Sequence, residues 1–101
     1  MITIPARFEL IGHTIRVEYD SDLIDEESAY GTCDPQKQLI KLQPPGPELT
    51  KEFVLQTFLH EAVHMWCYYM GYMNLYEDEK FVDLMGHCIY QFLKSKRGQP
   101  A

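Results

Sequence analysis

Hydrophobic and polar residues alternate along the first part of the chain. In residues 8–19, on both sides of Gly12, every second position is hydrophobic, a period typical of strands that bury one face. This pattern predicts a β-hairpin that turns near Gly12. Residues 29–43 show a second hairpin pattern around residues 34–37, whose Asp-Pro-Gln-Lys sequence has common turn chemistry. The acidic residues 20–28 between the hairpins are expected to form a solvated connection.

A helical pattern begins after residues 44–47, whose Pro-Pro-Gly-Pro sequence ends the second hairpin. Thr50 is suited to cap a helix, and Gly71 is a natural stop at its other end. The residues between them are hydrophobic on nearly every side, so we expect this helix at the buried centre of the fold. A second helix is predicted over residues 77–96 and is expected to pack against the first. Hydrophobic residues recur there at spacings of three and four: Phe81, Met85, Cys88 and Phe92.

Together these elements predict an α+β fold, in which two β-hairpins form a small antiparallel sheet packed on two helices. A length of 101 residues fits one compact domain over residues 1–101. The hydrophobic fraction of 46% is ample for a packed core, so disorder is not expected.

The net charge and the cysteines indicate which binding partners and which cellular compartment to expect. A net charge of −6 with only nine Lys and Arg residues argues against nucleic acid as a partner. No stretch approaches the roughly 18 to 20 hydrophobic residues that cross a bilayer, so no membrane partner is expected. Cys33, Cys67 and Cys88 are an odd number without paired spacing, which predicts buried or neutral reduced thiols and a cytoplasmic location.

Two histidines stand one helical turn apart in the middle of the hydrophobic helix. Residues 60–64 read His-Glu-Ala-Val-His and fit the pattern His-Glu-x-x-His, which lets two imidazoles reach one ion. Catalytic zinc takes three protein ligands and keeps a fourth position for water. We therefore predict that His60 and His64 bind Zn²⁺. Glu61, about 100° around the helix from His60, is predicted to be the general base that accepts a proton from that water. The alternative is a pair of hydrogen-bonded core histidines with Glu61 at the surface.

Spacing alone leaves the third zinc ligand open. Several carboxylates and one imidazole follow the motif: Glu77, Asp78, Glu79, Asp83 and His87. Glu79 and His87 lie about 12 Å apart along a helix and cannot both bind one ion. Asp78 is an alternative because it lies nearer the hydrophobic stripe of the second helix. Cys67 shares the face of the two histidines but lies about 10 Å along the axis from His60, so we predict a buried thiol.

Residues 59–93 resemble the gluzincin-type ImmA/IrrE zinc metallopeptidases and their small phage-encoded relatives. The His-Glu-x-x-His motif is followed by Glu-Lys-Phe-Val-Asp-Leu-Met-Gly at residues 79–86, where that family has Glu-x-x-Ala-x-x-Phe-Ala. Val82, Met85 and Gly86 replace the three non-ligand residues of the family pattern. The resemblance implies that Glu79 is the third zinc ligand.

The same resemblance carries an expectation about the substrate. It implies that the strand near residues 38–42 is a sheet edge that pairs with an extended peptide. The N-terminal helix common in the family is not visible in this sequence, and a predicted β-hairpin takes its place.

We therefore expect a zinc metallopeptidase that hydrolyses peptide bonds of a peptide or protein substrate through a zinc-activated water. Two alternatives remain: a zinc-stabilised regulatory or protein-interaction module without turnover, and a metal-free helical interaction protein. A phenol near the motif would be able to donate to the oxyanion formed during hydrolysis. The spacing does not select one among five candidates: Tyr68, Tyr69, Tyr72, Tyr76 and Tyr90.

Overall fold

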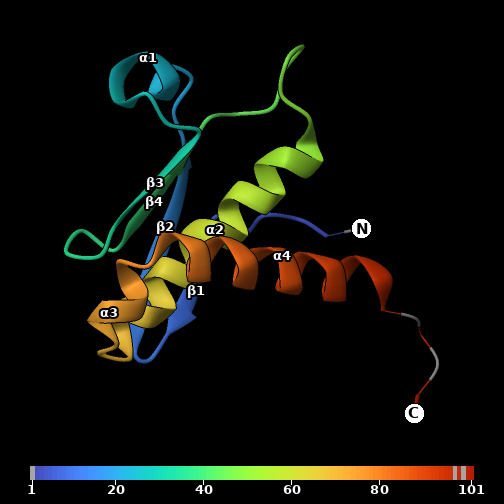
Figure 1. Ribbon diagram of the computed structural model, residues 1–101. Helices are drawn as coiled ribbons and strands as arrows, with labels where there is room; N and C mark the ends of the chain where they lie inside the picture. Colours follow the sequence, from blue (N-terminus) through green and yellow to red (C-terminus); the bar gives the residue numbers. More distant parts are fainter. Residues whose placement is uncertain (1, 97, 99) are drawn as a thin grey trace.

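The computed structural model describes residues 2–96, 98 and 100–101 and shows an α+β fold. Its elements follow the order β1 (Arg7–Leu10), β2 (His13–Tyr19), α1 (Leu23–Glu27), β3 (Gly31–Asp34), β4 (Leu39–Leu42), α2 (Lys51–Tyr69), α3 (Met73–Tyr76) and α4 (Glu79–Ser95). Figure 1 shows that the sheet lies on one side of α2, while α4 crosses α2 on the other. The fold therefore has α2 at its centre, as the sequence predicted.

Both predicted hairpins are present. β1 and β2 pair in antiparallel fashion, and their turn contains Ile11 with φ of 46° and Gly12 with φ of 81°. Two successive residues with positive φ make a turn whose twist matches that of the strands. β3 and β4 form the second antiparallel pair, and the Asp34 side chain accepts a hydrogen bond from the Lys37 N–H at 3.1 Å in its turn.

The sheet is mixed, so the prediction of an antiparallel sheet is wrong at one pairing. The strand order is β1-β2-β4-β3, and β2 runs parallel to β4. The prediction that residues 38–42 form a sheet edge is also wrong, since β4 lies between β2 and β3. Leu39, Ile40 and Leu42 are all buried, and hydrophobic residues on both faces suit an inner strand.

The described part of the chain contains four helices instead of the two that were predicted. The acidic connection contains the short helix α1, which is exposed except for Leu23, of which 1% is accessible. The short helix α3 joins α2 to α4. The Thr50 side chain caps α2 by accepting a hydrogen bond from the Phe53 N–H, and Gly71 follows the helix with φ of 85°. No helix in the described residues is both long and hydrophobic enough to cross a bilayer.

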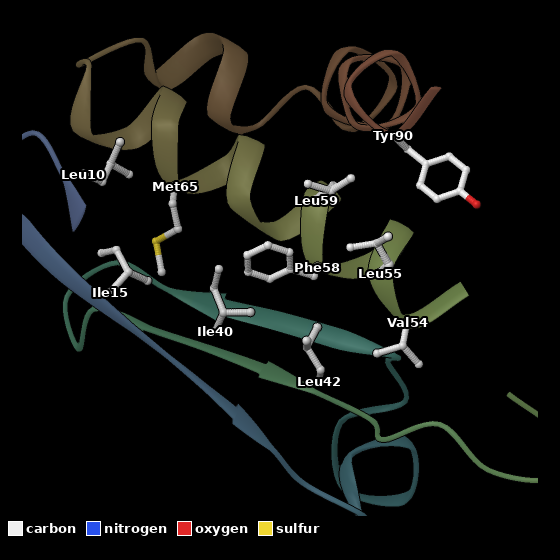
Figure 2. Packing of buried hydrophobic residues seen from close by; sticks show 10 residues of the cluster. All are labelled: Leu10, Ile15, Ile40, Leu42, Val54, Leu55, Phe58, Leu59, Met65 and Tyr90. Carbon is white, nitrogen blue, oxygen red and sulfur yellow. The ribbon is translucent and has the colours of Figure 1, made fainter. Parts of the chain in front are cut away.

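The main hydrophobic core lies between the sheet and α2. Figure 2 shows Ile15 and Ile40 pointing from the sheet toward Met65 and Phe58 on the helix. A second, smaller cluster lies between α2 and α4 and contains Val63, Cys67 and Val82. Because α2 is buried on both sides, its polar residues at positions 60, 61 and 64 lie within a largely hydrophobic layer.

The residues of α4 that pack on α2 are not the hydrophobic residues whose spacing predicted this helix. Val82, Gly86 and Tyr90 are its buried residues. Cys88 and Phe92 are exposed, and 66% of Phe92 is accessible. Of the three cysteines, which were expected to be buried or neutral, Cys67 is buried, Cys33 is half-buried and Cys88 is exposed.

Candidate metal centre

Two helices bring three potential metal ligands together. His60 and His64 lie one turn apart on α2, and Glu79 is the first residue of α4. The Nε2 atom of His60 lies 3.2 Å from Glu79 Oε1, and the Nε2 atom of His64 lies 3.2 Å from Glu79 Oε2. One ligand atom from each residue falls within 4.8 Å of the others. Two imidazole nitrogens and a carboxylate oxygen are a donor set that catalytic zinc takes, so these residues fit that ion.

Hydrogen-bond partners orient both imidazole rings. The Nδ1 atom of His64 lies 2.8 Å from the carbonyl oxygen of Tyr76. A carbonyl only accepts, so we assign the proton to Nδ1, which leaves the lone pair of Nε2 directed at Glu79. The Nδ1 atom of His60 lies 3.4 Å from Asp83 Oδ1. A carboxylate or carbonyl behind each ring is the usual support of a metal-binding histidine.

A glycine at the helix crossing allows α4 to reach the two histidines. A Cβ atom at Gly86 would lie 3.3 Å from Cα and 3.4 Å from the backbone nitrogen of His60. Glu79 is seven residues before Gly86, or about two helical turns, and Asp83 lies between them. The close backbone contact at Gly86 therefore sets the distance at which Glu79 and Asp83 approach α2.

Glu61 is buried beside this group and is not a surface residue. Only 7% of Glu61 is exposed, and the same fraction applies to His64. Burial raises the pKa of the Glu61 carboxyl, while the nearby His60 and His64 act in the opposite direction. The alternative reading, in which Glu61 lies at the surface, is wrong. Its role as a base stays a prediction.

Two cavities meet at Glu61. The larger, of about 570 Å³, is lined by Cys33, Tyr76 and the three potential ligands, among others. The smaller, of about 270 Å³, extends from His60 and Glu61 toward Tyr30. Gly31, His60 and Glu61 border both cavities. The two therefore form a groove that passes the potential metal ligands on one side and β3 on the other.

Two polar side chains of the larger cavity keep their protons at neutral pH. Burial raises the pKa of the Cys33 thiol, and the neighbouring Glu61 carboxylate acts in the same direction. Burial also raises the pKa of Tyr76 to about 12. Tyr76 is the only one of the five candidate tyrosines among the described residues that line the cavity, whereas Tyr90 donates a hydrogen bond to Glu52 at 2.7 Å.

The other candidate ligands have different positions. The Asp78 side chain caps α4 by accepting a hydrogen bond from the Phe81 N–H at 3.0 Å. The Nε2 atom of His87 lies 3.6 Å from Asp83 Oδ2 in the smaller cavity. Cys67 lies in the hydrophobic cluster between α2 and α4. Among the candidates from the sequence, the structure brings Glu79 to the two histidines.

Gly31 and Cys33 were not predicted as residues of the groove, and Asp83 was expected only as a candidate metal ligand. Cys33 and Gly31 lie on β3, far from the motif in sequence, and no local pattern marks them. Asp83 lies four residues after Glu79, and this spacing places both carboxylates on one face of α4. That spacing was the available signal for Asp83 as a partner of His60.

Comparison with protein-family models, curated proteins and solved structures found no match to this chain. The functional conclusion therefore rests on the geometry of the site.

Proposed function

We propose that this protein is a zinc-dependent metallopeptidase of minimal zincin-like architecture, with His60, His64 and Glu79 as ligands and Glu61 as the general base. One observation carries the proposal. One nitrogen of each histidine and a Glu79 carboxylate oxygen lie within 4.8 Å of one another, next to a buried glutamate and at a groove.

The chemistry follows from the donor set and from the burial of Glu61. A bound zinc ion supplies Lewis acidity that polarises a peptide carbonyl and lowers the pKa of water toward about 7. Glu61 accepts the proton from the attacking water and delivers it to the leaving amine. Burial raises the pKa of Glu61, which makes its carboxylate a stronger base than an exposed one. Asp83 and the Tyr76 carbonyl hold the rings of His60 and His64 in place during these steps.

An extended peptide fits along the outer edge of β3. The Gln43 N–H donates to the Tyr30 carbonyl at 2.8 Å, so backbone alternation turns the N–H and C=O of Gly31 and Cys33 away from β4. Gly31 and Cys33 also line the larger cavity. A peptide that pairs with these two residues would run past Glu61 and the ligand group, so β3 takes the role that the sequence analysis gave to residues 38–42.

We also propose a cytoplasmic location and a peptide or protein substrate. Cys33, Cys67 and Cys88 are free thiols, as in a reducing compartment.

Replacement of Glu61 by Gln separates a peptidase from a zinc-stabilised regulatory or interaction module. The amide keeps the size of the side chain but cannot accept the proton, so cleavage should fall by about 10² to 10⁴. Zinc content should stay at one ion per chain in both proteins. Native mass spectrometry measures the zinc, and mass spectrometry of a mixed peptide library measures cleavage. Equal cleavage by both proteins would rule out this mechanism. Cleavage by neither, with zinc present in both, would identify the module.

A further inference from the structure

The smaller cavity is a side pocket of the groove, and Gly31, His60 and Glu61 border both it and the larger cavity. Its walls come from three elements: the start of β3, one face of α2 and the middle of α4. Gly31 and Gly86 border it at the points where β3 and α4 approach α2 closely. A peptide held along β3 would place one of its side chains next to this pocket.

Aromatic rings stand at one end of the pocket. Tyr30 and Phe53 pack edge to face, with ring centroids 5.0 Å apart, and both are exposed. Their rings offer apolar area to a long side chain and a negative face to a cation. Thr57 and Gln56 continue this wall along α2. The Thr57 hydroxyl already donates to the Phe53 carbonyl at 2.9 Å.

The other end of the pocket is acidic. Asp83 lines it together with Glu61, and no Lys or Arg is among the described residues that border it. His60 and His87 flank the Asp83 carboxylate at 3.4 and 3.6 Å. The chain as a whole carries a net charge of −6, which favours positively charged peptides.

We propose that this pocket receives a basic side chain of the peptide substrate, Arg or Lys, and so determines specificity. The inference rests on the proposed peptidase function. The aliphatic stem of the side chain lies against Tyr30 and Phe53, and its cationic end lies near Asp83. A large apolar side chain would gain the aromatic contacts but would bring no positive charge to the Asp83 carboxylate, which it would partly remove from water.

Gln56 offers a test because it lines the pocket and is not one of the three potential metal ligands. Gln56→Arg places a positive charge in the pocket, and Gln56→Met is the matched neutral control. Both variants and the native protein are loaded with zinc and incubated at pH 8 with peptide libraries that differ in one fixed residue: Arg, Lys, Leu, Phe or Glu. Mass spectrometry locates the cleaved bond.

The native protein and Gln56→Met should prefer Arg or Lys over Leu and Glu by about tenfold at one position. Gln56→Arg should lose this preference for Arg and Lys over Leu, while its zinc content stays unchanged. Cleavage with no basic preference, or a preference for Phe and Leu that Phe53→Ala removes and Gln56→Arg does not, would overturn the inference and leave the peptidase function standing.

If the protein is not a peptidase, the same experiment gives a different result. Absence of cleavage with zinc bound would reject turnover, and binding of the same peptides to the zinc-loaded native protein would then test the pocket. Tighter binding of Arg than of Glu peptides, abolished in Gln56→Arg, supports the pocket assignment. Equal binding of all peptides overturns it.

Discussion

Gly31 determines how closely the edge strand β3 approaches α2. A Cβ atom there would lie 2.6 Å from the Thr57 methyl carbon and 3.3 Å from Cγ of Glu61. Gly31→Ala would gain about 0.5 to 1 kcal/mol from the lower entropy of the unfolded chain. Overpacking costs about 1 to 3 kcal/mol, so we expect a net loss in the free energy of unfolding. Urea denaturation of the purified variant measures it.

The matched second change is Thr57→Ser, which removes the methyl carbon that a Cβ would meet. Serine keeps the hydroxyl that donates to the Phe53 carbonyl. The double variant should therefore recover most of the stability lost in Gly31→Ala. A Gly31→Ala protein as stable as the native one, or a double variant with no recovery, would contradict this account of the close approach.

At the scale of elements, the crossing of α2 and α4 depends on Gly86. Gly86→Ala raises helix propensity by about 1 kcal/mol but places a methyl group 3.3 Å from the His60 backbone. The higher helix propensity stabilises the fold and the close contact destabilises it. Only the close contact moves Glu79 relative to the two histidines. We expect zinc affinity to fall by about tenfold or more, the range for lost support of a ligand. Titration against a chelating dye measures the affinity.

An exposed position of the same helix provides the control for this prediction. Gln91 lies on the outer side of α4. Gln91→Ala should leave zinc affinity unchanged, because it alters helix propensity without touching the crossing. Unchanged affinity in Gly86→Ala would show that the position of Glu79 does not depend on this contact.

Local patterns predicted the elements of the sheet better than their arrangement. The hairpin at Gly12 and the second hairpin depend on neighbours in sequence and are both confirmed. The parallel pairing of β2 with β4 depends on residues more than twenty positions apart, such as Arg16 and Leu39. The run of Leu39, Ile40 and Leu42 without alternation was the available sign of an inner strand.

The composition of α4 does not reveal which of its faces packs on α2. Hydrophobic residues lie on both of its sides, and Gly86 at the crossing has no side chain to count in a periodic pattern. For the candidate site, the spacing of four was enough to place His60 and His64 together. The assignment of Glu79 depended on the resemblance to a family, because the packing of a second helix brings this residue to the two histidines.

For the whole molecule, the candidate metal centre joins the central helix to the last one. His60 and His64 lie on α2 and Glu79 lies on α4, which packs on the side of α2 away from the sheet. An ion held by all three residues binds the folded chain and not the unfolded one, so its binding free energy adds to folding. At a free zinc concentration of 1,000 times Kd this amounts to about 4 kcal/mol.

We therefore expect zinc to raise the melting temperature by more than about 10 °C, since each kcal/mol shifts a domain of this size by about 4 to 8 °C. Differential scanning calorimetry with zinc and with a chelator measures the shift. Glu79→Gln should lose most of it, because an amide oxygen is a poorer zinc ligand than a carboxylate. His87→Gln, on the same helix but 3.6 Å from Asp83, should keep it. The reverse result would make His87 the third ligand, and the absence of any shift in the native protein would remove the metal centre altogether.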